Sequence, residues 1–160
     1  MLIKKNCCGN KHMKSYKLVH GDRLDLFKKI KKSSAQVIIT SPPYNIGKSY
    51  EKKKPLNEYL LEQEKTLREC FRVLKKGGSL CWQVGSYFER SELYPLDIYL
   101  YEICKKIGFK LRNRIVWHFE HGLHSNKKFS GRYETILWFT KSDKYYFNFD
   151  PIRVPQKYPG

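Results

Sequence analysis

The residues best suited to chemistry are Ser41, Pro42, Pro43 and Tyr44, which follow an apolar, β-branched run over residues 35–40. Two successive prolines hold the backbone rigid and remove two N–H donors, so the carbonyls of Ser41 and Pro42 remain as acceptors. A rigid set of acceptors beside an aromatic ring suits a planar molecule with an amino group, which can stack and donate its hydrogens. A strand-terminating turn with a packed tyrosine is the alternative, and the diproline alone would favour it.

The elements that must position this tetrapeptide alternate between strand and helix patterns. Residues 35–40 are typical of a strand buried on both faces, and open α/β sheets bind ligands where such strands end. Apolar spacing and caps predict helices over 24–30, 57–74 and 96–107, the second beginning at Asn57 and ending at Gly77-Gly78, the third ending at Gly108. Further strands are predicted over residues 16–20, 79–84, 110–119 and 135–140, with 145–149 pairing as a hairpin with the last of them.

Together these elements predict an α/β sheet that is mostly parallel and carries an antiparallel C-terminal hairpin. The length of 160 residues suggests one domain. We expect a basic flexible arm over residues 1–15, a catalytic part over 16–150 and an extended tail over 151–160.

The charge balance narrows the class of partner. The 32 basic and 15 acidic side chains give a net charge of +17, which favours an anionic partner such as nucleic acid or an anionic membrane, although a basic proteome would also account for it. No run approaches the ~20 apolar residues that span a bilayer. Residues 1–18 lack the apolar core of a signal peptide, so we expect a cytoplasmic protein. The five cysteines are an odd number without framework spacing and indicate reduced thiols.

A lysine-rich loop directly follows the tetrapeptide. Because of that position, we expect Lys48, Lys52, Lys53 and Lys54 to contact nucleic-acid phosphates, although lysine clusters are usually solvated faces. Tyr50 and Tyr44 are the aromatic residues best placed for a planar ligand.

A histidine series is the one pattern that suggests a metal. His118, His121 and His124 recur at three-residue spacing with Glu120 between them. No cysteine pair lies near, and a strand end that runs into a loop explains the series, so we expect no metal site.

Residues 40–45, Thr-Ser-Pro-Pro-Tyr-Asn, resemble the catalytic motif of the DNA amino-methyltransferases, which methylate adenine N6 or cytosine N4. Four further blocks resemble segments of the same family in the same order, and they lie at residues 20–22, 71–78, 114–117 and 132–139. The likeness covers residues 16 to 150. A catalytic motif near the N-terminus resembles the β arrangement of that family, in which target recognition and the main cofactor motif follow later.

The resemblance implies a Rossmann-like sheet and methyl transfer from S-adenosyl-L-methionine to double-stranded DNA, as in restriction–modification systems with a cognate endonuclease. It implies that Ser41 and the Pro42 carbonyl accept hydrogen bonds from the target amine while Tyr44 stacks on the base. Asp22 would lie near the cofactor adenine, or it caps the following helix. Within the family, a serine at this position favours cytosine N4 as the target, although adenine enzymes also carry this serine. The absence of a Pro-Cys pair argues against methylation of cytosine C5.

The family's glycine-rich cofactor turn, Phe-x-Gly-x-Gly, is missing from the sequence. We therefore expect an incomplete sheet, the N-terminal catalytic half of a longer protein, with a separate C-terminal half as a candidate partner and weak or no activity alone. Two alternatives stay open. One is a non-catalytic nucleic-acid-binding fragment, and the other is methylation of RNA or of a protein amide.

Overall fold

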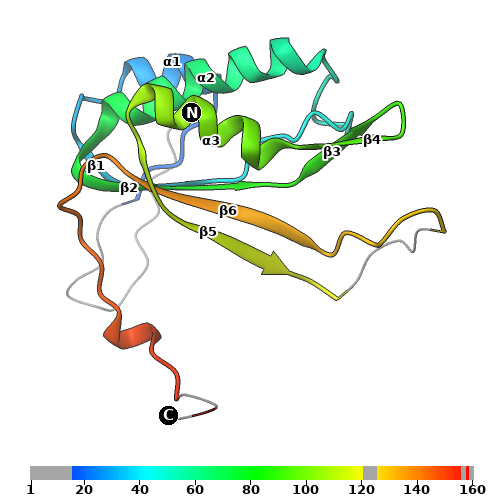
Figure 1. Cartoon of the computed structure of the whole chain (residues 1–160). Helices are drawn as coiled ribbons and strands as arrows, with labels where there is room; N and C mark the ends of the chain where they lie inside the picture. Colours follow the sequence, from blue (N-terminus) through cyan, green and yellow to red (C-terminus); the bar gives the residue numbers. More distant parts are fainter. Residues whose placement is uncertain (1–15, 121–125, 156–157, 159–160) are drawn as a thin grey trace.

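The chain forms a four-stranded sheet with its helices on one face, seen in a computed structural model that describes residues 16–120, 126–155 and 158 (Figure 1). The basic arm expected over residues 1–15 lies outside the described residues. The elements in chain order are α1 (Arg23–Lys28), β1 (Ala35–Thr40), α2 (Leu56–Val73), β2 (Leu74–Val84), β3 (Ser86–Glu89), β4 (Glu92–Pro95), α3 (Leu96–Ile107), β5 (Lys110–His118), β6 (Tyr133–Thr140) and the short 3-10 helix η1 (Asp150–Ile152).

The main sheet has the strand order β1-β2-β6-β5. β1 runs parallel to β2, and β6 runs antiparallel to both β2 and β5, which confirms an α/β sheet with an antiparallel strand pair near its C-terminal end. The hairpin expected between β6 and residues 145–149 is wrong, because β2 and β5 already occupy both hydrogen-bonding edges of β6. Tyr145 and Phe147 instead pack on the Trp138 ring, with centroid distances of 5.7 and 5.1 Å.

Helix α2 differs from its prediction at both ends. Pro55 occupies the N-cap position and no side chain caps the helix, so the assignment of Asn57 as the cap is wrong. The helix ends at Val73, because the backbone turns extended at Leu74 with a ψ of 137° and β2 begins there; the amide of Ser34 donates to the free Val73 carbonyl at 2.8 Å. The glycine pair expected to end α2 lies inside β2 instead.

One further strand prediction fails, and one hairpin was not predicted. The strand expected over residues 16–20 is reduced to an isolated bridge at Leu18. Residues 86–95 form an unexpected hairpin of β3 and β4, whose turn residues Arg90 and Ser91 have φ values of 49° and 66°. Positive φ at both central residues is the geometry that two-residue hairpin turns require. This hairpin projects at the same end of the molecule as the loop that follows β1 (Figure 1).

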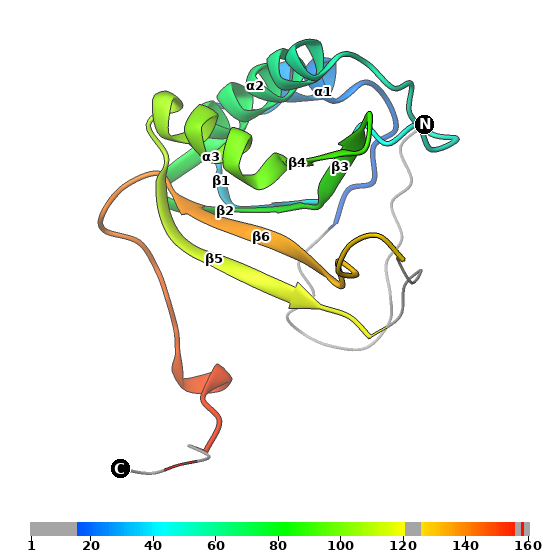
Figure 2. The same ribbon diagram turned by 45° about the vertical axis from the view of Figure 1, so that its right-hand side comes forward.

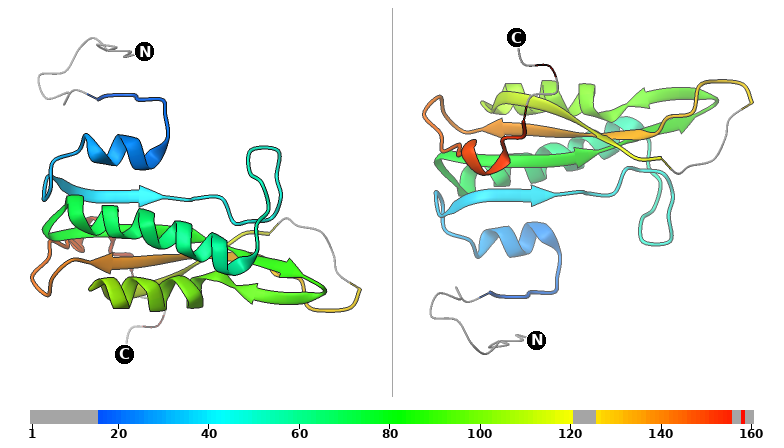
Figure 3. Two further views of the ribbon diagram at one scale, coloured as in Figure 1. Left: turned by 90° about the horizontal axis from the view of Figure 1, so that it is seen from above. Right: turned by 90° about the horizontal axis from the view of Figure 1, so that it is seen from below.

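One face of the sheet is packed and the other is not. Helices α2 and α3 cover the face that carries Leu80, Trp82 and Leu137, all of which are buried (Figure 2). Seen from the opposite side, no long helix of the described chain lies over the strands (Figure 3). Val37 and Ile39 of β1 point to this side and are 52% and 77% exposed, so the expectation of a strand buried on both faces is wrong for this chain. No helix among the described residues is long and apolar enough to cross a membrane.

Candidate active site

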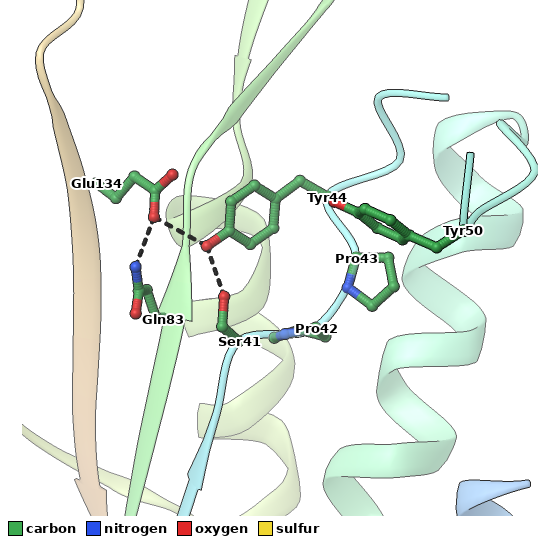
Figure 4. Close-up of a pocket in the computed structure, with 7 residues that line it drawn as sticks. All are labelled: Ser41, Pro42, Pro43, Tyr44, Tyr50, Gln83 and Glu134. Atoms are coloured by element: carbon green, nitrogen blue, oxygen red, sulfur yellow. Dashed lines mark hydrogen bonds between the residues drawn. The ribbon is translucent and has the colours of Figure 1, made fainter. Parts of the chain in front are cut away.

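A pocket of about 430 Å³ lies where β1 and β2 end. This volume falls within the roughly 300–1,000 Å³ of small-molecule sites. The lining residues come from three separate parts of the chain and are drawn in Figure 4: Ser41, Pro42, Pro43, Tyr44, Tyr50, Gln83 and Glu134. The structure thus brings together the four predicted catalytic residues and Tyr50. Gln83 and Glu134 were not expected as site residues. The one signal for Glu134 was its place in the block at residues 132–139, whereas nothing in the local sequence separates Gln83 from ordinary strand residues.

A chain of hydrogen bonds runs across the floor of this pocket (Figure 4). The hydroxyl oxygens of Ser41 and Tyr44 are 2.8 Å apart, and the Tyr44 hydroxyl donates to a Glu134 carboxylate oxygen at 2.9 Å. The side-chain amide of Gln83 donates to the same oxygen at 2.6 Å. Burial raises the pKa of Tyr44 to about 12, and the nearby Glu134 carboxylate acts in the same direction. The Tyr44 hydroxyl therefore keeps its proton at neutral pH.

The Tyr44 ring lies in a space that a glycine leaves open. A Cβ at Gly85 would stand 3.2 Å from two carbons of the ring. Such a contact is tighter than van der Waals packing allows without movement, so any larger residue at this position would displace the ring.

The diproline segment is braced by helix α2. Tyr59 is 4% exposed, and its hydroxyl donates to the Pro43 carbonyl at 2.9 Å. Burial raises the pKa of Tyr59, so the phenol keeps the proton with which it donates. The contact engages the carbonyl of Pro43, whereas the carbonyls expected to receive a ligand belong to Ser41 and Pro42.

Asn45 and Glu51 close the lysine-rich loop. The Asn45 side chain accepts from the Lys54 amide and donates to the Lys54 carbonyl, both at 2.7 Å. The Glu51 carboxylate accepts from the amides of Asn45 and Ile46 at 2.8 and 2.9 Å. Asn45 is 2% exposed and has a φ of 62°. These contacts hold Tyr50, whose side chain is 72% exposed, at the rim of the pocket (Figure 4).

The four lysines expected to meet phosphates differ in their surroundings. Lys48 and Lys52 are exposed on the loop. The Lys53 ammonium lies 5.2 Å from the centre of the Tyr87 ring, and Lys54 forms an ion pair with Glu62. Lys48 and Lys52 therefore have the fewest internal contacts to give up when an anionic partner approaches.

Asp22 lies outside the pocket and caps helix α1. One carboxylate oxygen accepts from the amides of Leu24 and Asp25 at 2.8 and 3.4 Å. The capping interpretation of Asp22 is confirmed, and a contact from its other oxygen to a ligand is compatible with it.

The histidine series is only partly visible. His118 ends β5, whereas His121 and His124 lie outside the described residues. Within residues 16–120, 126–155 and 158, no three His, Cys, Asp or Glu side chains gather as a metal site would require.

The fold and the pocket define an α/β protein with a ligand site at the carboxyl end of β1, where the sequence Ser-Pro-Pro-Tyr directly follows the strand. A family model described as DNA methylase matches residues 35–159, and the chain belongs to this family. The resemblance to β-type DNA amino-methyltransferases is thereby confirmed.

Individual relatives agree with this assignment. Type II methyltransferase M.BglII of Bacillus subtilis is 51% identical over 143 residues, a match that covers 89% of this chain and 40% of that protein. The DNA adenine methyltransferase YhdJ of Escherichia coli K12 is 36% identical over 148 residues, covering 88% of this chain and 46% of the other. TTHA0409 of Thermus thermophilus, solved in complex with S-adenosyl-L-methionine, is 28% identical with a TM-score of 0.65, covering 84% of this chain and 58% of that one. The chain thus spans less than half the length of these two curated relatives.

Proposed function

We propose that this chain supplies the amine-binding part of a DNA methyltransferase that moves a methyl group from S-adenosyl-L-methionine to cytosine N4 or adenine N6. The observation that carries the proposal is the pocket itself, in which a hydroxyl and a rigid diproline segment adjoin the Tyr44 ring. We place the reaction on double-stranded DNA in the cytoplasm, within a restriction–modification system that includes a cognate endonuclease.

The chemistry follows from the nature of the amine. An exocyclic amine is a poor nucleophile because its lone pair is delocalised into the ring. Hydrogen bonds from its protons to Ser41 Oγ and the Pro42 carbonyl localise charge on the nitrogen, which can then form a bond to carbon. When bound, S-adenosyl-L-methionine would supply the electrophilic methyl group, its sulfur would keep the electron pair of the broken bond to carbon, and the amine would release one proton to water.

The target base must leave the duplex before it reaches this pocket. Unstacking and unpairing cost a few kcal/mol, and stacking on an aromatic ring contributes about 1–3 kcal/mol in return. Tyr44 is the residue we propose for this stack, with Tyr50 at the rim as the second aromatic surface. Lys48, Lys52, Lys53 and Lys54 are proposed to hold the flanking phosphates, the first two most strongly because they are the less engaged.

The described residues fit the methyl donor only in part. Asp22 is the residue that we propose to lie near the adenine of S-adenosyl-L-methionine. Its capping role is compatible with this contact, because the cap uses only one of the two carboxylate oxygens. The sequence contains no Phe-x-Gly-x-Gly turn to hold the rest of the donor. We therefore expect weak binding of S-adenosyl-L-methionine by this chain.

A second candidate is a nucleic-acid-binding module without catalysis. The net charge of +17 favours this candidate, as does the small number of residues available to bind S-adenosyl-L-methionine. Ser41 favours cytosine N4 over adenine N6 within the main proposal, and product analysis decides between the two bases.

One experiment separates these two functions. The chain, alone and mixed with the part of M.BglII outside the matched segment, is incubated with DNA and radiolabelled S-adenosyl-L-methionine, and the nucleosides are analysed by mass. N4-methylcytosine or N6-methyladenine that depends on Ser41 supports the proposal, with Ser130→Ala as a control for serine loss elsewhere. Product as 5-methylcytosine overturns the mechanism. DNA binding with neither binding of the donor nor methylation in either mixture supports the non-catalytic module.

A further inference from the structure

The hydrogen-bond chain in the pocket has a direction, which is set at Glu134. An ionised carboxylate only accepts hydrogen bonds, so the single hydrogen of the Tyr44 hydroxyl points toward Glu134, 2.9 Å away. The Tyr44 oxygen can then only accept from Ser41, 2.8 Å away. The hydrogen of Ser41 is therefore used inside the chain, and the lone pairs of its oxygen are left for whatever enters the pocket.

We propose that Glu134 is a positioning residue that makes the pocket selective for bases with an amino group over bases with a keto group at the same position. The inference rests on the proposed function, because it concerns the same amine-binding site. An amino group donates to Ser41 Oγ, whereas a keto oxygen meets only another acceptor there. The Glu134 carboxylate thus acts on the bound base through the hydroxyl groups of Tyr44 and Ser41.

Gln83 keeps Glu134 in this role. Its side-chain amide donates to the carboxylate oxygen that also receives the Tyr44 hydrogen, at 2.6 Å. Gln83 and Glu134 lie on the adjacent strands β2 and β6, on the face of the sheet that the long helices leave open (Figure 4). The Tyr44 hydroxyl and the Gln83 amide thus converge as two donors on one half-buried carboxylate oxygen, which accepts from both.

The substitution Glu134→Gln tests the direction of the chain with almost no change in shape. Once the Gln83 side chain turns its carbonyl toward position 134, a glutamine there can donate one amide hydrogen to Gln83 and the other to Tyr44. Tyr44 can then donate to Ser41, and Ser41 can donate into the pocket. Ser41 would then suit a keto group, while the Pro42 carbonyl would still accept from an amino group, so the preference between the two should be lost. A merely structural role of Glu134 would weaken binding of all bases alike and would leave the preference unchanged.

The measurement uses the 160-residue chain labelled with ¹³C at the tyrosine rings, titrated with dCMP against dUMP and with dAMP against dIMP. We expect the wild-type chain to prefer the amino member of a pair by roughly tenfold, the effect of one mismatched hydrogen bond. Glu134→Gln should bring this ratio close to one. Tyr44→Phe should also abolish the ratio while the ring still binds both members. Glu102→Gln, an exposed position on α3, should leave the ratio unchanged.

The outcomes separate the inference from the proposed function. If the wild-type chain prefers amino bases and Tyr44→Phe retains that preference, the hydrogen-bond chain does not set the direction of Ser41 and the inference is overturned, although the amine site stands. If the wild-type chain binds neither member of either pair, the proposed function loses its support. In that case the titration of Tyr44, followed in the tyrosine spectra, decides the inference. Glu134→Gln should lower the pKa of Tyr44, and an unchanged pKa overturns the inference. If the glutamine variant does not fold, Tyr44→Phe decides the inference, because it removes the hydroxyl that links Glu134 to Ser41.

Discussion

Replacement of Asn45 by alanine should open the lysine-rich loop. The Asn45 side chain makes two hydrogen bonds of 2.7 Å to the backbone of Lys54, and alanine removes both. Each contributes about 0.5–1.5 kcal/mol net. Alanine also tolerates the left-handed backbone at φ 62° less well than asparagine, which adds about 1 kcal/mol. The loop should lose about 2–4 kcal/mol of its stability against opening.

Amide hydrogen exchange at Lys54 reports this opening directly. A loss of that size should speed exchange of the Lys54 amide by between about 30- and 700-fold, with a smaller effect on global unfolding in urea. Asn45→Gly is the matched control, because glycine accepts the positive φ and removes only the hydrogen bonds. It should therefore show a smaller acceleration than alanine.

Two results would refute this reasoning. One is a wild-type chain in which the Lys54 amide exchanges as fast as that of the exposed Lys52. The other is an Asn45→Ala chain with unchanged exchange at Lys54. If the two hydrogen bonds between Asn45 and Lys54 hold the loop, Asn45→Ala should also weaken nucleotide binding, because Tyr50 depends on the loop for its place at the rim of the pocket.

Three further predictions concern the core, a cap and the basic loop. Leu80→Ala should lower the free energy of unfolding, measured by urea denaturation, by about 2–5 kcal/mol. Ile39→Ala on the open face should change it by no more than about 0.5 kcal/mol, and similar losses at both positions would contradict a sheet with one packed and one open face. Asp22→Ala should cost about 1 kcal/mol through the lost N-cap of α1, and Asp22→Asn should restore most of it. Loss of both Lys48 and Lys52 should reduce the slope of log affinity for duplex DNA against log salt by nearly 2, and an unchanged slope would show that neither meets a phosphate.

Features with a local cause could be predicted from the sequence. The strand over residues 35–40, the helix over 96–107 and its end at Gly108 depend on neighbouring residues alone, and all three are confirmed. The chemical character of Ser41-Pro42-Pro43-Tyr44 is also local, because two prolines restrict the backbone in any fold. Capping of α1 by Asp22 belongs to the same kind, since the residues concerned lie within one helical turn.

Other features depend on which strands become neighbours, and only the tertiary structure decides that. Residues 145–149 have a strand pattern, yet both edges of β6 are occupied, so they pack on Trp138 instead. β1 has the composition of a strand that is buried on both faces, but burial of its second face needs a layer that the described residues do not contain. Glu134 meets Tyr44 across 90 positions of sequence. Such a meeting is fixed by the pairing of β1 with β2 and of β2 with β6, because a hydrogen bond between side chains requires proximity in space, which a local pattern does not encode.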